Sequence, residues 1–330
     1  MAALHFRPIN SALFVLYEPQ GAPSMDIIFF HGLHFESKAY DQAYWKSWMS
    51  LSKSELQLQG DPNEAEELPV CWPEKWLGPE FGARILSIKY DSSITETPTT
   101  GRMTMQNLGE NLIQDILRTK LVPMVGKQSV FLVGHSLGCL VIKQLLLHSQ
   151  GCVDASKRMI ENMKLPNGHA EVRKYETIKS FLDSVKGLCF YSPPLQGTRL
   201  ADFVQTRGRY NVSPTFEFLK TLSTEAALLN DRFRVWRSSS VSPLRVNTIA
   251  ESLPTMQWGY NKVVVCEAAC RTDTDKMYTA AADHFTVIRP ISPMSSLYQD
   301  LTNFIEEQSG VHRMQAQEQM EREQMLQELL

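Results

Sequence analysis

Gly134-His135-Ser136-Leu137-Gly138 joins two apolar segments of different periodicity. Residues 129–133 before it form a short apolar run, which indicates a buried strand, and residues 140–147 after it follow a helical pattern. Glycines on both sides of Ser136 let a strand and a helix approach closely, and they suit a serine whose backbone is strained. The stretch therefore predicts a tight strand–turn–helix unit that lifts the Ser136 hydroxyl off a sheet.

A Gly-x-Ser-x-Gly turn in this context is typical of the nucleophile elbow of an α/β-hydrolase. The competing interpretation is a strand-to-helix turn with an ordinary serine. Serine is a weak nucleophile, so a base must take its proton and a carboxylate must orient that base. In this fold the three residues follow the chain order serine, acid, histidine.

His284 is the expected base. Only His284 and His312 follow the apolar run of residues 262–266, which we expect to be the last strand. His312 lies in a polar tail, whereas His284 lies in a loop that precedes a terminal amphipathic helix.

Glu251 is the expected acid, because it directly follows the apolar run of residues 245–250. A carboxylate at the end of that strand can reach the second ring nitrogen of the base. Asp273 and Asp275 remain alternatives because they lie nearer to His284 in the sequence, and Asp283 is the weakest because adjacent loop side chains usually diverge.

Two backbone amides are expected to form an oxyanion hole. One is the amide of Leu137, at the positive end of the expected helix. The other comes from the loop after the apolar run of residues 26–30, where Leu33 is preferred and Gly32 is the second choice.

The chain-wide pattern predicts an α/β fold with a mostly parallel central sheet and helices on both faces. Short continuous apolar runs alternate with helical segments, which is typical of such a sheet. We expect a single α/β-hydrolase domain over residues 1–308, with a surface insertion at residues 49–68 and a polar C-terminal tail at 309–330. The elbow helix is expected to end near Gly151, and residues 152–184 to form a helical extension or a cap.

Composition narrows the function classes. With 33 basic and 36 acidic residues the net charge is −3, so no basic field indicates nucleic acid as a partner. No apolar stretch approaches a transmembrane span, which leaves at most peripheral association with a membrane. The first residues lack a signal peptide pattern, so the cytoplasm is the expected location. Six scattered cysteines suit buried free thiols, and neither a metal nor a cofactor is expected.

Several motifs together resemble the serine-active-site-containing protein family of α/β-hydrolases, which is related to lipases and inositol deacylases. The motifs, in chain order, are Phe30-His31-Gly32-Leu33, Cys71-Trp72-Pro73, Ala83-Arg84-Ile85-Leu86-Ser87, the turn at Ser136, Glu251-Ser252-Leu253-Pro254-Thr255 and Asp283-His284. Cys139 and the segment of residues 192–198 depart from the family pattern. The resemblance implies an ester or lipid substrate.

These observations predict a serine hydrolase that cleaves a carboxylic ester, including a lipid ester, through an acyl-enzyme. A thioesterase or an amidase would use the same groups, and the fold does not choose among them. A different class also fits, a binding or scaffold protein on a hydrolase fold. The polar tail after Gly310 is the feature that suits that class.

Overall fold

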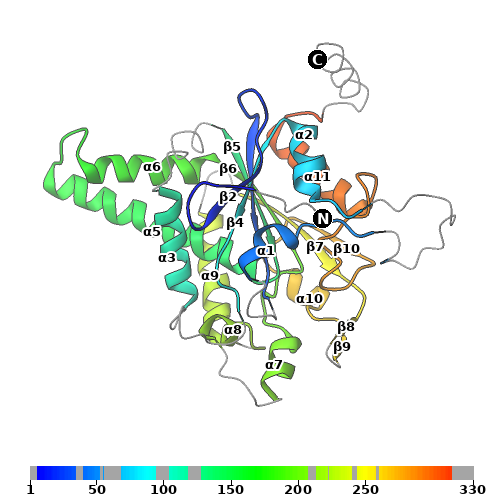
Figure 1. The fold of residues 1–330 in the computed structure, drawn as a ribbon. Coiled ribbons are helices and arrows are strands. Elements are labelled where there is room, and N and C mark those ends of the chain that lie inside the picture. Colours follow the sequence, from blue (N-terminus) through cyan, green and yellow to red (C-terminus); the bar gives the residue numbers. More distant parts are fainter. Residues whose placement is uncertain are drawn as a thin grey trace, which may run out of the picture.

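A twisted eight-stranded sheet forms the centre of the protein (Figure 1). The computed structural model describes residues 6–34, 40–52, 55, 68–93, 104–117, 128–206, 213–221, 223–239, 244–257 and 260–313. The strands run in the order β1 (Arg7–Pro8), β2 (Leu13–Tyr17), β4 (Arg84–Ile88), β3 (Met25–Phe30), β5 (Ser129–His135), β6 (Val185–Tyr191), β7 (Arg245–Glu251), β10 (Lys276–Ala280). From β4 to β10 all neighbours are parallel, and β2 is antiparallel to both β1 and β4.

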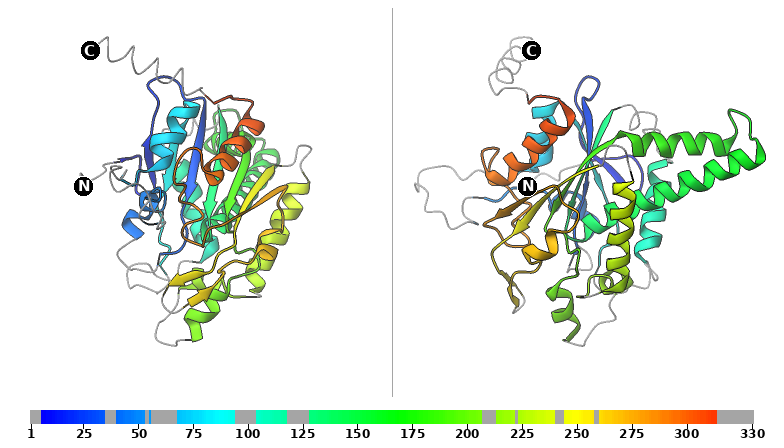
Figure 2. Two further views of the ribbon diagram at one scale, coloured as in Figure 1. Left: turned by 90° about the vertical axis from the view of Figure 1, so that its right-hand side faces the viewer. Right: turned by 180° about the vertical axis from the view of Figure 1, so that it is seen from behind.

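Helices cover both faces of this sheet, as predicted. On one face lie α3 (Met105–Leu117), α5 (Leu137–Met163), α6 (Ala170–Ser184) and α9 (Thr224–Ser238), and on the other η2 (Pro73–Leu77), α2 (Gly78–Phe81) and α11 (Ser296–Ser309). Shorter elements are α1 (Tyr40–Lys46), α7 (Arg199–Thr206), α8 (Pro214–Glu217), α10 (Glu267–Cys270) and the hairpin of β8 (Thr255–Gln257) and β9 (Tyr260–Lys262). Figure 2 shows the two helical layers from the side and from behind.

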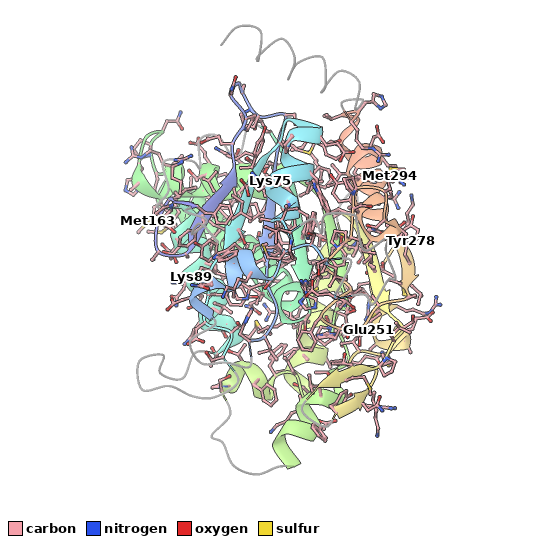
Figure 3. The ribbon with its side chains drawn as sticks, turned by 45° about the vertical axis from the view of Figure 1, so that its right-hand side comes forward. Lys75, Lys89, Met163, Glu251, Tyr278 and Met294 are labelled. Carbon is pink, nitrogen blue, oxygen red and sulfur yellow. The ribbon has the colours of Figure 1, made fainter. Side chains whose placement is uncertain are left out.

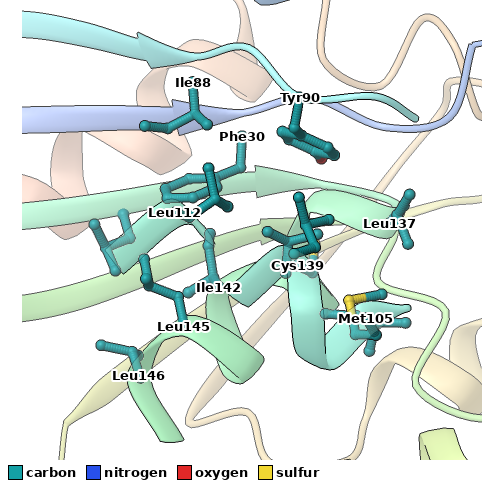
Figure 4. Packing of buried hydrophobic residues seen from close by; sticks show 14 of the residues in the cluster. Phe30, Ile88, Tyr90, Met105, Leu112, Leu137, Cys139, Ile142, Leu145 and Leu146 are labelled. Atoms are coloured by element: carbon teal, nitrogen blue, oxygen red, sulfur yellow. The ribbon is translucent and has the colours of Figure 1, made fainter. Parts of the chain in front are cut away.

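The alternating side chains of each central strand supply two separate cores. In β3, Ile28 and Phe30 face the α3 and α5 side, whereas Ile27 and Phe29 face the α2 and α11 side. Figure 4 shows the first core, in which Phe30 and its neighbours pack against residues of α3 and α5. Burial on both faces explains why the central strands read as continuous apolar runs.

The predicted last strand at residues 262–266 is wrong. Only Lys262 belongs to a strand, the short β9, and Val264 and Val265 lie buried in the turn that follows. The last strand of the sheet is β10, whose residues are largely exposed because it lies at the sheet edge. Cys266 is exposed, so the expectation of buried thiols fails there.

The predicted end of the elbow helix near Gly151 is also wrong. Helix α5 continues for 27 residues to Met163, and its C-cap Lys164 has a left-handed φ of 50°. Residues 152–184 thus extend α5 and add α6, which leads into the first residue of β6. The α5–α6 hairpin projects from the body of the molecule, and Met163 lies far from Glu251 (Figures 1 and 3).

Other sequence expectations concern segments that are described only in part. The expected surface insertion at 49–68 is described at residues 49–52, 55 and 68, where Ser50 donates its backbone N–H to Val70. The polar tail is described up to residue 313, and its remainder lies outside the described residues. Among the helices that are described, none has the length and apolarity that a membrane crossing needs.

Candidate active site

Ser136 stands at the junction of β5 and α5 with an unusual backbone. Its φ of 51° and ψ of −120° place it outside the ordinary regions for a residue with a side chain. The Ser136 N–H donates to the carbonyl of Tyr191 on β6 at 2.9 Å, which ties the turn to the neighbouring strand. The surrounding structure therefore holds a strained serine at the carboxyl end of the central strand.

Both glycines of the motif are required by close backbone approach. A Cβ at Gly138 would lie 2.2 Å from the carbonyl oxygen of Phe30, and one at Gly134 would lie 2.9 Å from the amide nitrogen of Cys139. Such separations are shorter than van der Waals contact, so any larger residue would push α5 away from the sheet.

The structure brings Ser136, His284 and Glu251 into one hydrogen-bonded chain. The Ser136 hydroxyl lies 2.9 Å from Nε2 of His284, and Nδ1 of His284 lies 2.5 Å from Oε2 of Glu251. All three residues are at most 5% exposed. With the proton on Nδ1, His284 donates to the carboxylate and its Nε2 can accept the serine proton, which is the arrangement that nucleophilic catalysis needs.

Glu251 is held by more than the histidine. Its Oε1 accepts hydrogen bonds from the backbone N–H groups of Val264 and Val265, at 2.6 and 3.0 Å. Burial raises the pKa of this carboxyl, but the nearby His284 and the hydrogen bonds from His284 and Val265 outweigh burial, so the pKa of Glu251 is lowered. The group is therefore an ionised acceptor facing the imidazole.

The two alternative acids have other partners. Asp273 contacts Lys143 at 3.1 Å and Arg234 at 2.8 Å, and it links α5 to α9. Asp275 pairs with Arg237 and accepts the backbone N–H of Val246 at 2.8 Å. Both carboxylates are therefore engaged in ion pairs and hydrogen bonds with residues other than His284.

The expected oxyanion donors lie beside the serine. Leu137 is the first residue of α5, where a helix leaves its N–H without an intrahelical partner. The loop after β3 passes directly against the turn, because a Cβ on Gly32 would lie 3.1 Å from Cβ of Ser136. Leu33 follows in the same loop and lines the cavity at Ser136. Tyr90 fixes the loop by stacking on His31, with ring centroids 4.2 Å apart, and by donating to the His31 carbonyl.

Three features of the site were missed from sequence. His135, inside the motif itself, contacts the loop that carries His284. The amides of Val264 and Val265 hold Glu251, and the hydroxyl of Thr255 accepts the backbone N–H of His284 at 3.2 Å. The Glu251-x-x-x-Thr255 spacing was a usable signal for Thr255. Val264 and Val265 lie only 13 and 14 residues from Glu251, but the sequence analysis placed them in a strand. His135 is 149 residues from His284, which is too distant to pair from sequence.

The cavity above Ser136 is nearly filled. It holds about 10 Å³, roughly the space that one water molecule needs. A larger groove of about 690 Å³ lies at the amino ends of β6 and β7, and it contains none of the three hydrogen-bonded residues. The hydrogen-bonded residues Ser136, His284 and Glu251, and not the size of the cavity, therefore identify the candidate active site. The cavity is lined by Leu33, His135, Ser136, Thr198, Leu200, Ala201, Phe216, Leu219, Val264, His284 and Phe285.

Metal-ligand clustering is not found in the described part of the chain, where no group of three or more histidine, cysteine or carboxylate side chains could hold an ion. Besides His284, both His31 and His135 place a ring nitrogen within hydrogen-bond distance of a backbone carbonyl. Nδ1 of His31 lies 2.9 Å from the Gly32 carbonyl, and the rings of His31 and His34 are 5.5 Å apart.

The architecture is that of an α/β-hydrolase fold. Its marks are the strand order, the single antiparallel strand inside one edge of the sheet and the serine turn at the centre of the sheet.

No protein-family model matches the chain. The chain is similar to Protein SERAC1 from Danio rerio, with 25% identity over 295 residues, 87% of this chain and 40% of that protein. Protein SERAC1 from Homo sapiens is 24% identical over 286 residues, covering 86% and 38%. The chain thus spans about 40% of the length of these curated relatives.

Solved structures with a similar fold include lipases. The mature lipase BlEst2 from Bacillus licheniformis is 16% identical with a TM-score of 0.40, covering 87% of this chain and 96% of that one. A monoacylglycerol lipase from Paleococcus ferrophilus is 12% identical with a TM-score of 0.41, covering 88% and 97%. At these identities the likeness concerns the fold alone.

Proposed function

We propose that this protein is a serine hydrolase that cleaves a carboxylic ester, including a lipid ester, through an acyl-enzyme. The observation that carries the proposal is the hydrogen-bonded chain from the Ser136 hydroxyl through His284 to Glu251, buried at the end of the central strands. The strained Ser136 turn supports its assignment as a nucleophile elbow.

In this proposal His284 takes the serine proton as Ser136 attacks the acyl carbonyl. Glu251 stabilises the imidazolium that forms, and its lowered pKa keeps it ionised for that task. The amides of Leu137 and Leu33 donate to the oxyanion, and losing one such donor typically costs about 10²–10³ in rate. His284 then gives its proton to the departing alkoxide, and water releases the acyl group by the reverse sequence.

The lining of the cavity supports an apolar substituent on the substrate. Leu33, Leu219 and Phe285 surround Ser136, together with Leu200 and Ala201 of α7. Because the cavity is nearly filled, an ester enters only after side chains of this wall move. The lipase names of proteins with a similar fold, and the ester or lipid substrate implied by the motifs, agree with this class.

Fluorophosphonate labelling tests the proposal. We expect wild type to be labelled at Ser136 and Ser136→Ala not to be labelled. Ser149→Ala is the matched control, since Ser149 is also buried in α5 but donates to the Leu145 carbonyl of its own helix, and it should be labelled like wild type. A folded wild type that is not labelled would support the binding or scaffold class instead. If labelling succeeds, hydrolysis of ester, thioester and amide panels identifies the bond that is cleaved.

A further inference from the structure

The ring of His135 lies between the two loops that complete the site. Its Nε2 is 2.8 Å from the backbone carbonyl oxygen of His284, and the two imidazole centroids are 5.0 Å apart. A carbonyl oxygen only accepts, so Nε2 of His135 carries the proton and donates. The backbone of His284 is thereby held by a side chain from the end of β5, directly beside Ser136.

The opposite edge of the same ring faces the loop after β3. A Cβ on Gly32 would lie 2.8 Å from Nδ1 of His135, so the backbone of this loop passes against the ring. With the proton on Nε2, Nδ1 carries a lone pair. One ring therefore separates the loop that carries the proposed base from the loop that carries the proposed oxyanion donor.

His135 is neutral in this position. Burial, and after it the neighbouring His284, lower the pKa of His135 well below its usual 6.5. A neutral ring offers one donor and places no positive charge beside His284. It can hold the backbone of His284 without opposing the imidazolium that the proposed reaction forms.

We propose that His135 is a positioning residue for acyl transfer, which sets the spacing between His284 and the loop at Gly32. The proposal rests on the function proposed above. In this role His135 acts through the backbone of His284, to which its Nε2 donates. Displacement of a reacting group by about 1 Å can cost about 10²-fold in rate.

Three substitutions separate the hydrogen bond from packing. The side-chain amide of His135→Gln can place a donor near the original Nε2, whereas the shorter amide of His135→Asn stops near Nδ1. His135→Leu fills space without a donor. We expect His135→Asn and His135→Leu to lower kcat by about 10- to 100-fold with little change in KM. His135→Gln should recover most of that loss.

A second readout does not depend on turnover. The Nδ1–H proton of His284, shared with Glu251, should give a downfield proton NMR signal in wild type and in His135→Gln. That signal should shift or broaden in His135→Leu, because the ring of His284 is no longer fixed.

The outcomes distinguish this proposal from the one on which it rests. If wild type is not labelled by a fluorophosphonate, the proposed function fails. The NMR signal of His284 in wild type, His135→Gln and His135→Leu then tests on its own whether His135 positions His284. If all three variants lose activity in proportion to their melting temperature, or if His135→Leu keeps wild-type kcat and an unchanged signal, the positioning role is overturned.

Discussion

Ser136 and Ser192 directly follow the neighbouring strands β5 and β6, and both have left-handed φ values, 51° and 44°. A residue with a side chain in such a conformation costs about 1–3 kcal/mol, so the contacts around it must hold it there. At Ser136 the contact is the bond to the Tyr191 carbonyl, and at Ser192 the N–H donates to the Ile249 carbonyl at 2.8 Å. Each strained serine is thus fixed by the next strand along the sheet, in the direction of Glu251.

At the residue scale, Glu251→Gln tests the choice of acid. The amide keeps the shape of the side chain but removes the negative charge that faces Nδ1 of His284. We expect kcat to fall by up to about 10⁴-fold, because the imidazolium loses its counter-charge and the tautomer is no longer fixed. Steady-state hydrolysis of the best ester found in the panel measures this.

Asp273→Asn is the matched comparison for Glu251→Gln. Asp273 contacts Lys143 and Arg234, so the substitution should lower the melting temperature while leaving kcat within a few-fold of wild type. A large loss of kcat in Asp273→Asn together with a small loss in Glu251→Gln would move the acid to the later loop.

At the element scale, the junction of β3 with α5 depends on Gly138. Gly138→Ala places a methyl group 2.2 Å from the Phe30 carbonyl oxygen, so α5 must shift and carry Ser136 with it. We expect a loss of about 1–3 kcal/mol in the free energy of unfolding and reduced labelling of Ser136. Urea denaturation and the labelling rate measure the two effects.

Gly151→Ala provides the control within the same helix. Apart from the backbone of its own helix and its chain neighbours, no atom lies within 4 Å of the position of its Cβ, and Gly151 is exposed in the middle of α5. Alanine there should stabilise the protein by about 0.5–1 kcal/mol without changing labelling. Equal destabilisation by both substitutions would contradict the close-approach argument.

The elements that the sequence predicted correctly are the strands buried on both faces and the helices with one clear apolar face. The runs around Phe30 and Ser136 are continuous and apolar, and the helix over residues 105–117 has one apolar face. The edge strand β10 was missed because its residues are largely exposed and do not form an apolar run. Residues 262–266 were misread because apolar side chains there fill a turn whose amides bind Glu251.

The predicted end of helix α5 near Gly151 was wrong because packing between helices is not visible in the sequence. Glycine at position 151 resembles a stop signal, but packing of α5 against α6 sustains the helix beyond it. The site residues Ser136, Glu251 and His284 could be proposed from the serine motif, the expected strand ends and the chain order, with Asp273 and Asp275 left as alternative acids. The contact of His135 with His284 spans 149 residues of sequence, and only the folded chain brings those two together.

At the scale of the whole molecule, the neutral rings of buried His31 and half-buried His34 affect stability in acid. Burial lowers the pKa of His31 to about 3 and that of His34 to about 4. In the unfolded chain these rings bind protons near pH 6.5, so between that value and the folded pKa the unfolded state binds more protons. Stability from these groups is therefore lost as pH falls, by about 1.4 kcal/mol per pH unit for each neutral ring.

The measurement is the difference between wild type and His34→Gln, by urea denaturation at about pH 8 and about pH 5. The difference is needed because Asp26 acts in the opposite direction: burial raises its pKa despite the Arg84 partner. We expect the variant to lose less stability on acidification than wild type. Equal losses would mean that His34 takes up a proton in the folded state.

Helix α5 carries Ser136 at one end and an exposed turn, residues 164–169, at the other. Its 27 residues make the helix about 40 Å long, and the hairpin with α6 extends outward from the sheet (Figure 2). Exposed hairpin tips of this kind accept inserted sequence readily. The turn is consequently a suitable insertion site, where an epitope or a fluorescent reporter domain would lie at the far end of α5 from Ser136.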